Sequence, residues 1–180
     1  MISIIDETIY NVIIGLFSVP TTLIMTFISH LGSATAVILL SIVFLIVLKN
    51  KKQAASISIN LILVYLLNVI IKEIVARPRP EILRLVHETS YSFPSGHAMV
   101  ATGFYGYLIY IAYKKISKKS LRNTVIALLS TLILLIGISR IYLGVHYATD
   151  VIGGFIIGIL YLVLYIKISK GVSLWEKSLQ

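Results

Sequence analysis

The chain has 180 residues, of which 58% are hydrophobic and 13% are charged, and its mean hydropathy is +0.96. A water-soluble domain has about 25% charged residues and under about 50% apolar ones, so that class of protein is excluded. The absence of cysteine excludes disulfides, thiolate metal sites and a cysteine nucleophile. The net charge of +9 does not indicate a nucleic-acid partner, because the basic residues cluster between apolar runs and not on a water-exposed face.

Five charge-free runs are candidate membrane spans, namely residues 8–48, 53–71, 98–113, 123–139 and 151–166. A bilayer core of about 30 Å needs a helix of about 20 residues, and flanking tyrosines and lysines extend the shorter runs. Backbone groups inside lipid must pair with one another, so these spans are predicted to be helical. The sequence therefore predicts an all-α integral membrane protein that sits in a lipid bilayer.

The first run is long enough for two crossings, and it is interrupted at residues 30–33. Its second half, residues 34–48, is predicted to span the membrane. Its first half contains Pro20 and small or polar residues at a helical spacing, which favours a helix in the membrane interface over a sixth span. The predicted fold is a bundle of five transmembrane helices plus this N-terminal interfacial helix or sixth span.

The lysines and arginines form two groups along the predicted bundle. The larger group follows the first, third and fifth spans and comprises Lys49, Lys51, Lys52, Lys114, Lys115, Lys118, Lys119, Arg122, Lys167, Lys170 and Lys177. Cytoplasmic loops are enriched in Lys and Arg, so these segments and the C-terminus are predicted to lie in the cytoplasm. The opposite ends of the helices are then predicted to face outward from the cell membrane.

The outward-facing ends carry a second group of cations that the topology does not explain. This group contains Lys72, Arg77, Arg79, Arg84 and Arg140, and it comes with His87, His97, His146 and Asp150. Cations at helix ends indicate an anionic ligand. Arg79 and Arg140 can each offer a bidentate fork to phosphate oxygens, and Lys72 can offer a point charge.

Other residues near these ends are predicted to have structural roles. Arg77 and Arg84 are expected to be structural or rim residues that pair with glutamates 81 and 88, and His87 is expected to lie at the rim. Gly154 and Gly158 on the last run are expected to form a close helix-packing face.

His146 and Asp150 stand four residues apart at the predicted start of the last helix, so their side chains are neighbours if this turn is helical. A carboxylate that accepts from the imidazole Nδ1–H fixes the tautomer and leaves Nε2 as a basic or nucleophilic lone pair. The same pair also fits a polar cap at a helix start, and the spacing leaves both interpretations open.

Pro94 and Ser95 precede a long apolar stretch that begins near His97, which is typical of a helix N-terminus. The N–H groups of Gly96 and its neighbours, together with the Ser95 hydroxyl, are predicted to point at an anion that the helix dipole favours. His97 would then lie at the edge of the bound anion.

Three segments resemble the three motifs of the type 2 phosphatidic acid phosphatase (PAP2) superfamily, in order and without a substitution. They are Lys72-x6-Arg79-Pro80, Pro94-Ser95-Gly96-His97 and Ser139-Arg140-x5-His146-x3-Asp150. The residues around the second and third motifs also resemble small bacterial membrane enzymes of the phosphatidylglycerophosphatase B and undecaprenyl-diphosphatase type. The resemblance covers about residues 30–168.

The resemblance implies a metal-independent phosphatase that needs no cofactor. His146 would attack phosphorus to form a phosphohistidine, Asp150 would orient it, and His97 would protonate the leaving oxygen. The residues implied to hold the phosphate are Lys72, Arg79, Ser95, Gly96 and Arg140. The implied substrate is a membrane lipid phosphate such as undecaprenyl diphosphate, phosphatidylglycerophosphate or phosphatidic acid. We then expect residues 1–32 to form the N-terminal helix, residues 33–168 the catalytic domain and residues 169–180 a cytoplasmic tail.

Two other functions use the same residues. His97, His146 and Asp150 form a set that could bind a divalent metal in a metal-dependent phosphoesterase, but three cations in the same site would repel a metal ion. A lipid-phosphate transporter or scaffold without catalysis would also place cations at helix ends. Such a transporter is expected to show internal repeats or broken helices at mid-membrane, and the sequence shows no repeat.

Overall fold

The computed structural model describes residues 4–81 and 84–171, and the regular structure within these ranges is α-helical. Its helices are α1 (Ile4–Ile14), α2 (Val19–Leu31), α3 (Ala34–Val47), α4 (Lys51–Val75), α5 (Gly96–Lys115), α6 (Lys119–Tyr142) and α7 (Ala148–Gly171). The prediction of an all-α protein is therefore confirmed for the described residues. Residues 172–180, most of the predicted C-terminal tail, lie outside them.

Local sequence signals account for the ends of several helices. The side chains of Ser18 and Asn50 accept hydrogen bonds from backbone N–H groups three residues later, so they cap the starts of α2 and α4. Helix α4 ends at Val75, and the next residue, Ala76, adopts a left-handed conformation with a φ of 47°. Pro78 follows and keeps the chain out of the helix, as the sequence predicts.

Helices α4, α6 and α7 are long and apolar enough to cross a membrane, and α2 and α3 meet the same requirement together, with a bend of 48° between them. The bend falls within the predicted interruption at residues 30–33. The sequence prediction placed the first span in residues 34–48 alone. Helix α3 has only 14 residues, fewer than the roughly 20 that a bilayer requires. Only together with α2 does it reach the length of a span.

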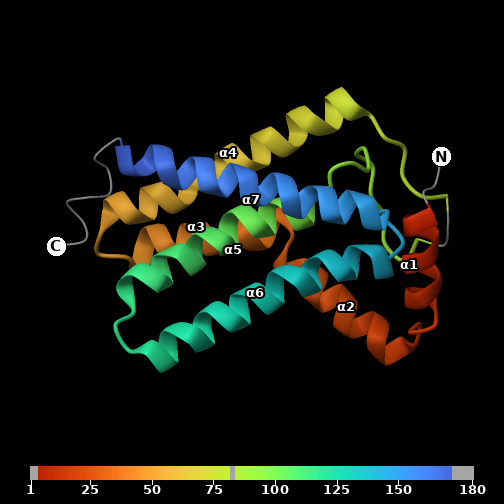
Figure 1. Ribbon diagram of the computed structural model, residues 1–180, viewed down its shortest axis with the longest axis horizontal. Helices are drawn as coiled ribbons and strands as arrows, with labels where there is room; N and C mark the ends of the chain where they lie inside the picture. The colour runs from red at the N-terminus through yellow and green to blue at the C-terminus, as the bar shows by residue number, and fades with distance from the viewer. Residues whose placement is uncertain (1–3, 82–83, 172–180) are drawn as a thin grey trace.

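Helix α5 lies inside the bundle and packs against α4, α6 and α7 (Figure 1). It has 20 residues, and it does not reach the hydropathy that α4, α6 and α7 have, since it contains several glycines and tyrosines. Among the described helices, three meet the length and hydropathy required for a span, or four with the bent pair, whereas five were predicted. Helix α5 accounts for the difference between five and four, since its small residues pack against neighbouring helices.

The contact between α5 and α7 depends on two glycines. A Cβ atom at Gly154 would lie 2.9 Å from the carbonyl oxygen of Ser95, and one at Gly158 would lie 2.8 Å from Thr102 Cβ. The predicted close-packing face is therefore confirmed. It brings the start of α5 against the start of α7, where the backbone N–H of Ser95 donates to the carbonyl oxygen of Asp150 over 3.0 Å.

The two ends of the bundle differ in composition. The connections that follow α3 and α5 carry the predicted lysine-rich segments and lie at one end, where Lys115 donates to Gln53 over 2.6 Å. The connections that follow α4 and α6 lie at the other end, and α1 runs across this end at a steep angle to the bundle (Figure 1). The outer faces of the long helices expose large apolar side chains such as Ile62, Leu128 and Leu160, as expected of a membrane protein.

Candidate active site

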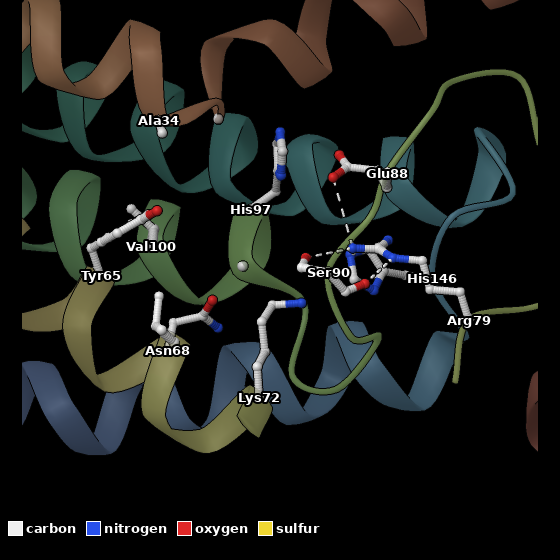
Figure 2. Close-up of a pocket in the computed structure, with 13 residues that line it drawn as sticks. Ala34, Tyr65, Asn68, Lys72, Arg79, Glu88, Ser90, His97, Val100 and His146 are labelled. Atoms are coloured by element: carbon white, nitrogen blue, oxygen red, sulfur yellow. Dashed lines mark hydrogen bonds and ion pairs between the residues drawn. The ribbon is translucent and has the colours of Figure 1, made fainter. Parts of the chain in front are cut away.

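A cavity of about 180 Å³ opens at the α1 end of the bundle, between α4, α5 and the loop that joins them. It brings together five residues that the sequence singled out, and Figure 2 shows four of them around it. These five are Lys72, Arg79, Gly96, His97 and His146. Residues separated by more than 70 positions in the sequence therefore share one site, as predicted.

The cavity has a charged end and an apolar end. Lys72, Arg79 and His146 lie on one side in Figure 2, and Ala34, Tyr65 and Val100 lie on the other. Tyr65 is 47% exposed on the outer face of α4. A ligand with a phosphate group and an apolar chain matches this division.

His146 lies just before α7 and is almost fully buried. Its Nδ1 atom is 3.5 Å from Oδ2 of Asp150, so the structure brings the predicted pair together. The same Oδ2 accepts hydrogen bonds from the Ser92 hydroxyl over 2.5 Å and from the backbone N–H of Tyr147 over 2.9 Å. Asp150 therefore has a fixed orientation and serves both as a helix cap and as the partner of His146.

The environment of His146 favours its neutral form. Burial lowers the pKa of His146 to about 3, and the nearby charges of Arg79 and Arg140 act in the same direction, while the hydrogen bond with Asp150 opposes them. With Nδ1 turned to Asp150, the Nε2 atom faces Arg79 at 3.4 Å. His146 thus presents an unprotonated Nε2 at neutral pH, which is the form that a nucleophile requires.

The loop between α4 and α5 holds Arg79 in place. Its guanidinium donates to the carbonyl oxygens of Ser90 over 2.6 Å and of Val145 over 2.7 Å, and to the Ser90 hydroxyl over 3.1 Å. Lys72, on the last turn of α4, donates to the carbonyl oxygen of Tyr91 in the same loop. Both cations are buried and fixed before any ligand binds.

Arg140 and Glu88 form an ion pair beside the cavity. Arg140 donates to Glu88 through one terminal nitrogen and to the Ser29 hydroxyl over 2.6 Å through the other. The second oxygen of Glu88 lies 3.7 Å from Arg79. The prediction that Glu88 pairs with Arg77 or Arg84 is wrong, because the loop folds back over the bundle and brings Glu88 to the cations of the site.

A family model described as the PAP2 superfamily matches residues 53–172. The chain belongs to the PAP2 superfamily. Phosphatidylglycerophosphatase B of Bacillus subtilis (strain 168) is 37% identical over 142 residues, which are 76% of this chain and 70% of that protein. Undecaprenyl-diphosphatase of Sulfolobus acidocaldarius is 28% identical over 141 residues, 75% of this chain and 64% of that protein.

The fold agrees with this assignment. The crystal structure of a PAP2 type phosphatidylglycerolphosphate phosphatase from Bacillus subtilis matches with a TM-score of 0.84 and 32% identity, over 95% of this chain and 87% of that one. This PAP2 chain is therefore a membrane phosphatase, and the predicted family and enzyme class are confirmed.

Two residues of the second PAP2 motif have distinct positions. The hydroxyl of Ser95 is fully buried and caps α5 by accepting from the N–H of Ala98 over 3.5 Å, and Ser95 does not line the cavity. Gly96 does line it, and a Cβ atom at this position would lie 3.0 Å from Asn68 Oδ1. Ser95 thus orients the helix N-terminus, and Gly96 allows it to approach α4.

Arg77 has different partners from those expected in this PAP2 protein. Its guanidinium donates to Asp150 over 2.5 Å and to Asp6 over 3.1 Å, and it stacks on the Tyr147 ring at 4.1 Å. Arg84 donates to the carbonyl oxygen of Pro80. The expected pairing of Arg77 with a glutamate of the loop is wrong, because the chain after α4 turns towards α1 and α7.

Several residues of the site were not predicted from the sequence. Tyr65 and Asn68 lie seven and four residues before Lys72, on the same face of α4, so helical spacing alone could have found them. Ser92 lies two residues before the second motif and carried no separate signal. No three His, Cys, Asp or Glu side chains within residues 4–81 and 84–171 come together in a way that could hold a metal ion.

Proposed function

We propose that this PAP2 protein hydrolyses the phosphomonoester or diphosphate of a membrane lipid through a phosphohistidine on His146. The cavity supports this proposal best, because its charged end holds the nucleophile and the cations while its apolar end leads to the outer face of α4. Lys72 and Arg79 are already fixed by the loop, so little reorganisation is needed when phosphate binds.

In the first proposed step, Nε2 of His146 attacks phosphorus, so that a P–N bond forms and the P–O bond to the lipid breaks. His97 donates its proton to the departing oxygen. Asp150 retains the Nδ1–H contact and stabilises the positive charge that develops on the His146 ring. For a lipid diphosphate the leaving group is the lipid monophosphate, and for a monoester it is the lipid alcohol.

In the second proposed step, His97 accepts a proton from water as the water oxygen attacks phosphorus. The P–N bond breaks, inorganic phosphate leaves, and His146 returns to its neutral form. Lys72, Arg79 and the N–H of Gly96 bind the phosphoryl oxygens in both steps, because charge on these oxygens dominates the transition state.

Arg140 completes the proposed phosphate site. Its Nε atom is buried and has no hydrogen-bond partner among the described residues, although its two terminal nitrogens are bonded. An unpaired buried donor costs free energy that a phosphate oxygen would recover. Ser95 contributes through the orientation of the α5 N-terminus.

We further propose five crossings, by the α2–α3 pair and by α4, α5, α6 and α7. This arrangement gives one end of the bundle the lysine-rich connections and the other end the site. The positive-inside rule then places the C-terminus in the cytoplasm and the site on the extracytoplasmic face. Substrates are lipids whose phosphate lies at headgroup depth on that face, and undecaprenyl diphosphate, phosphatidylglycerophosphate and phosphatidic acid all satisfy this condition.

The experiment that tests this function measures inorganic phosphate released from these three lipids by the purified protein in detergent. The wild type is expected to release phosphate with EDTA present, and kcat/KM identifies the preferred lipid. His146→Ala is expected to be inactive, and His30→Ala, which changes an exposed histidine outside the site, is expected to match the wild type. Metal-restored activity after EDTA, or an active His146→Ala variant, would contradict the proposal.

A further inference from the structure

We propose that Asp6 and Arg77 are positioning residues, and that Asp6 acts through Arg77 to hold Asp150 against His146. The N-terminal helix α1 is then part of the catalytic apparatus, although it lies outside residues 53–172, which the family model matches. This inference rests on the proposed function, because it concerns how the nucleophile is oriented.

Arg77 connects two buried carboxylates through separate nitrogens. One terminal nitrogen is 2.5 Å from Oδ1 of Asp150, and the other is 3.1 Å from Oδ2 of Asp6. The other oxygen of Asp150, Oδ2, is the one that faces His146. Each oxygen of Asp150 therefore has its own partner, and the Arg77 contact determines which oxygen turns to the histidine.

Asp6 also binds the first turn of α7. Its Oδ1 atom accepts from the backbone N–H of Thr149 over 2.8 Å, and its Oδ2 atom accepts from the Thr149 hydroxyl over 3.0 Å. Backbone N–H groups in the first turn of a helix have no partner within the helix. Asp6, which belongs to a different helix, thus caps α7 at Thr149, the residue before Asp150.

Burial and charge explain why this arrangement matters. Asp150 is 0% exposed and Asp6 is 3% exposed, so each carboxylate needs a partner inside the protein. Without Asp6, the positive charge of Arg77 would attract Asp150 alone, and this attraction would compete with the contact between Asp150 and His146. The carboxylate of Asp6, on the other side of Arg77, offsets part of the attraction between Arg77 and Asp150.

The position of α1 is consistent with this role. It lies across the end of the bundle that contains the site, and it packs against α6 and α7 (Figure 1). Asp6 and Tyr10 of this helix, together with His146 and Tyr147, line a second cavity of about 320 Å³. His146 therefore has the phosphate cavity on one side and α1 on the other.

The test is a double-mutant cycle on the full chain, with kcat and KM measured for lipid phosphate in detergent. Asp6→Asn is expected to lower kcat about 10-fold, similar to the loss when an outer partner of a metal-binding histidine is removed, and to leave KM within about twofold. Arg77→Gln is expected to lower kcat further. The double variant is expected to lose less than the product of the two single losses, because Asp6 acts partly through Arg77 and partly through its hydrogen bonds to Thr149.

Two conservative variants separate positioning from folding. Arg77→Lys keeps the charge but cannot contact both carboxylates with a planar fork, so it is expected to lower kcat as much as Asp6→Asn does. Asp6→Glu keeps the charge and is expected to recover part of the lost kcat. Glu73→Gln, which changes an exposed carboxylate of α4 outside both cavities, is the control and is expected to match the wild type.

The outcomes separate this inference from the proposed function. If the wild type is active, His146→Ala is inactive and Asp6→Asn has the wild-type kcat, the positioning role is wrong and the function stands. Additive losses of kcat in the double variant would also overturn the positioning role. So would a change in the KM of Asp6→Asn with kcat unchanged. A wild type that releases no phosphate from any lipid tested would overturn the function itself.

Discussion

The carboxylate of Glu88 pairs with the guanidinium of Arg140 and lies 3.7 Å from that of Arg79. An acidic side chain therefore lies between two of the cations at the phosphate cavity. Two consequences follow from Coulomb's law at this range. Glu88 balances the buried cations while the site holds no substrate, and it opposes the binding of an anion there.

Glu88→Gln is therefore expected to tighten binding of phosphate to the site. Removal of one like charge at the edge of the cavity should lower the inhibition constant of inorganic phosphate about 3- to 10-fold, since the glutamate is partly exposed and its charge is partly screened. Competitive inhibition of lipid phosphate hydrolysis measures this constant. Glu81→Gln, an exposed glutamate of the same loop, is the control, and an unchanged or higher constant in Glu88→Gln would contradict the expectation.

The buried state of His146 predicts a specific dependence of stability on pH. Its pKa falls from an unfolded value of about 6.5 to about 3 in the folded protein, so the folded state favours the neutral ring. The buried neutral ring therefore costs the folded state no stability above about pH 6.5. As the pH falls from about 6.5 towards about 3, protonation of this histidine in the unfolded chain lowers the free energy of unfolding. Thermal unfolding in detergent across this range is expected to show a smaller loss of Tm for His146→Gln than for the wild type.

The control for this measurement is His30→Gln, since His30 is exposed. It is expected to lose Tm on acidification as the wild type does. Equal acid sensitivity of His146→Gln and the wild type would show that His146 is not buried in its neutral form.

The assignment of His97 as the general acid predicts a dependence on the leaving group. His97→Gln should lower the rate for an alkyl lipid phosphate by about 10²- to 10⁴-fold, the usual contribution of general acid catalysis. The loss of kcat/KM, which reports formation of the phosphoenzyme and not the shared second step, should be much smaller for an aryl phosphate with an apolar tail, because its oxygen leaves without protonation. Equal losses of kcat/KM for both substrates would remove His97 from the role of general acid.

Ser92 gives a separate prediction about the orientation of Asp150. Its hydroxyl donates to the oxygen of Asp150 that faces His146, over 2.5 Å. Ser92→Ala should lower kcat about 10-fold with little change in KM, because loss of this bond lets the carboxylate turn away from the imidazole. Ser120→Ala, at the opposite end of the bundle, provides the control in the same kinetic assay. A Ser92→Ala enzyme with the wild-type kcat would exclude this role.

Short-range patterns in the sequence predicted much of this protein. The apolar runs predicted helices, and the spacing between His146 and Asp150 predicted the contact that the structure contains. Pro94 and Ser95 predicted the start of α5 correctly. The helix predictions succeeded because each depends on a few neighbouring residues and on the geometry of one helix. The His146–Asp150 contact forms differently, since His146 lies before α7 and outside the helical turn that the spacing assumed.

The contacts that Glu88 and Asp6 make with distant segments were not predicted from the sequence. Glu88 and Asp6 meet the site only because a loop folds back and because α1 crosses the end of the bundle. Neither residue has a spacing relative to its partner that a helix or a motif could reveal. The hydropathy of residues 8–48 also did not predict that α2 and α3 together are long and apolar enough for one span, with a bend of 48° between them.

The most direct measurement of the central claim is the capture of the phosphoenzyme. The protein is mixed with a lipid phosphate that carries a radiolabel on phosphorus, quenched in alkali within one turnover, and digested for mass spectrometry. The proposed mechanism predicts an alkali-stable, acid-labile phosphate on the peptide that contains His146, and no label in His146→Ala. A phosphate on another residue, or phosphate release by His146→Ala at the wild-type rate, would contradict it.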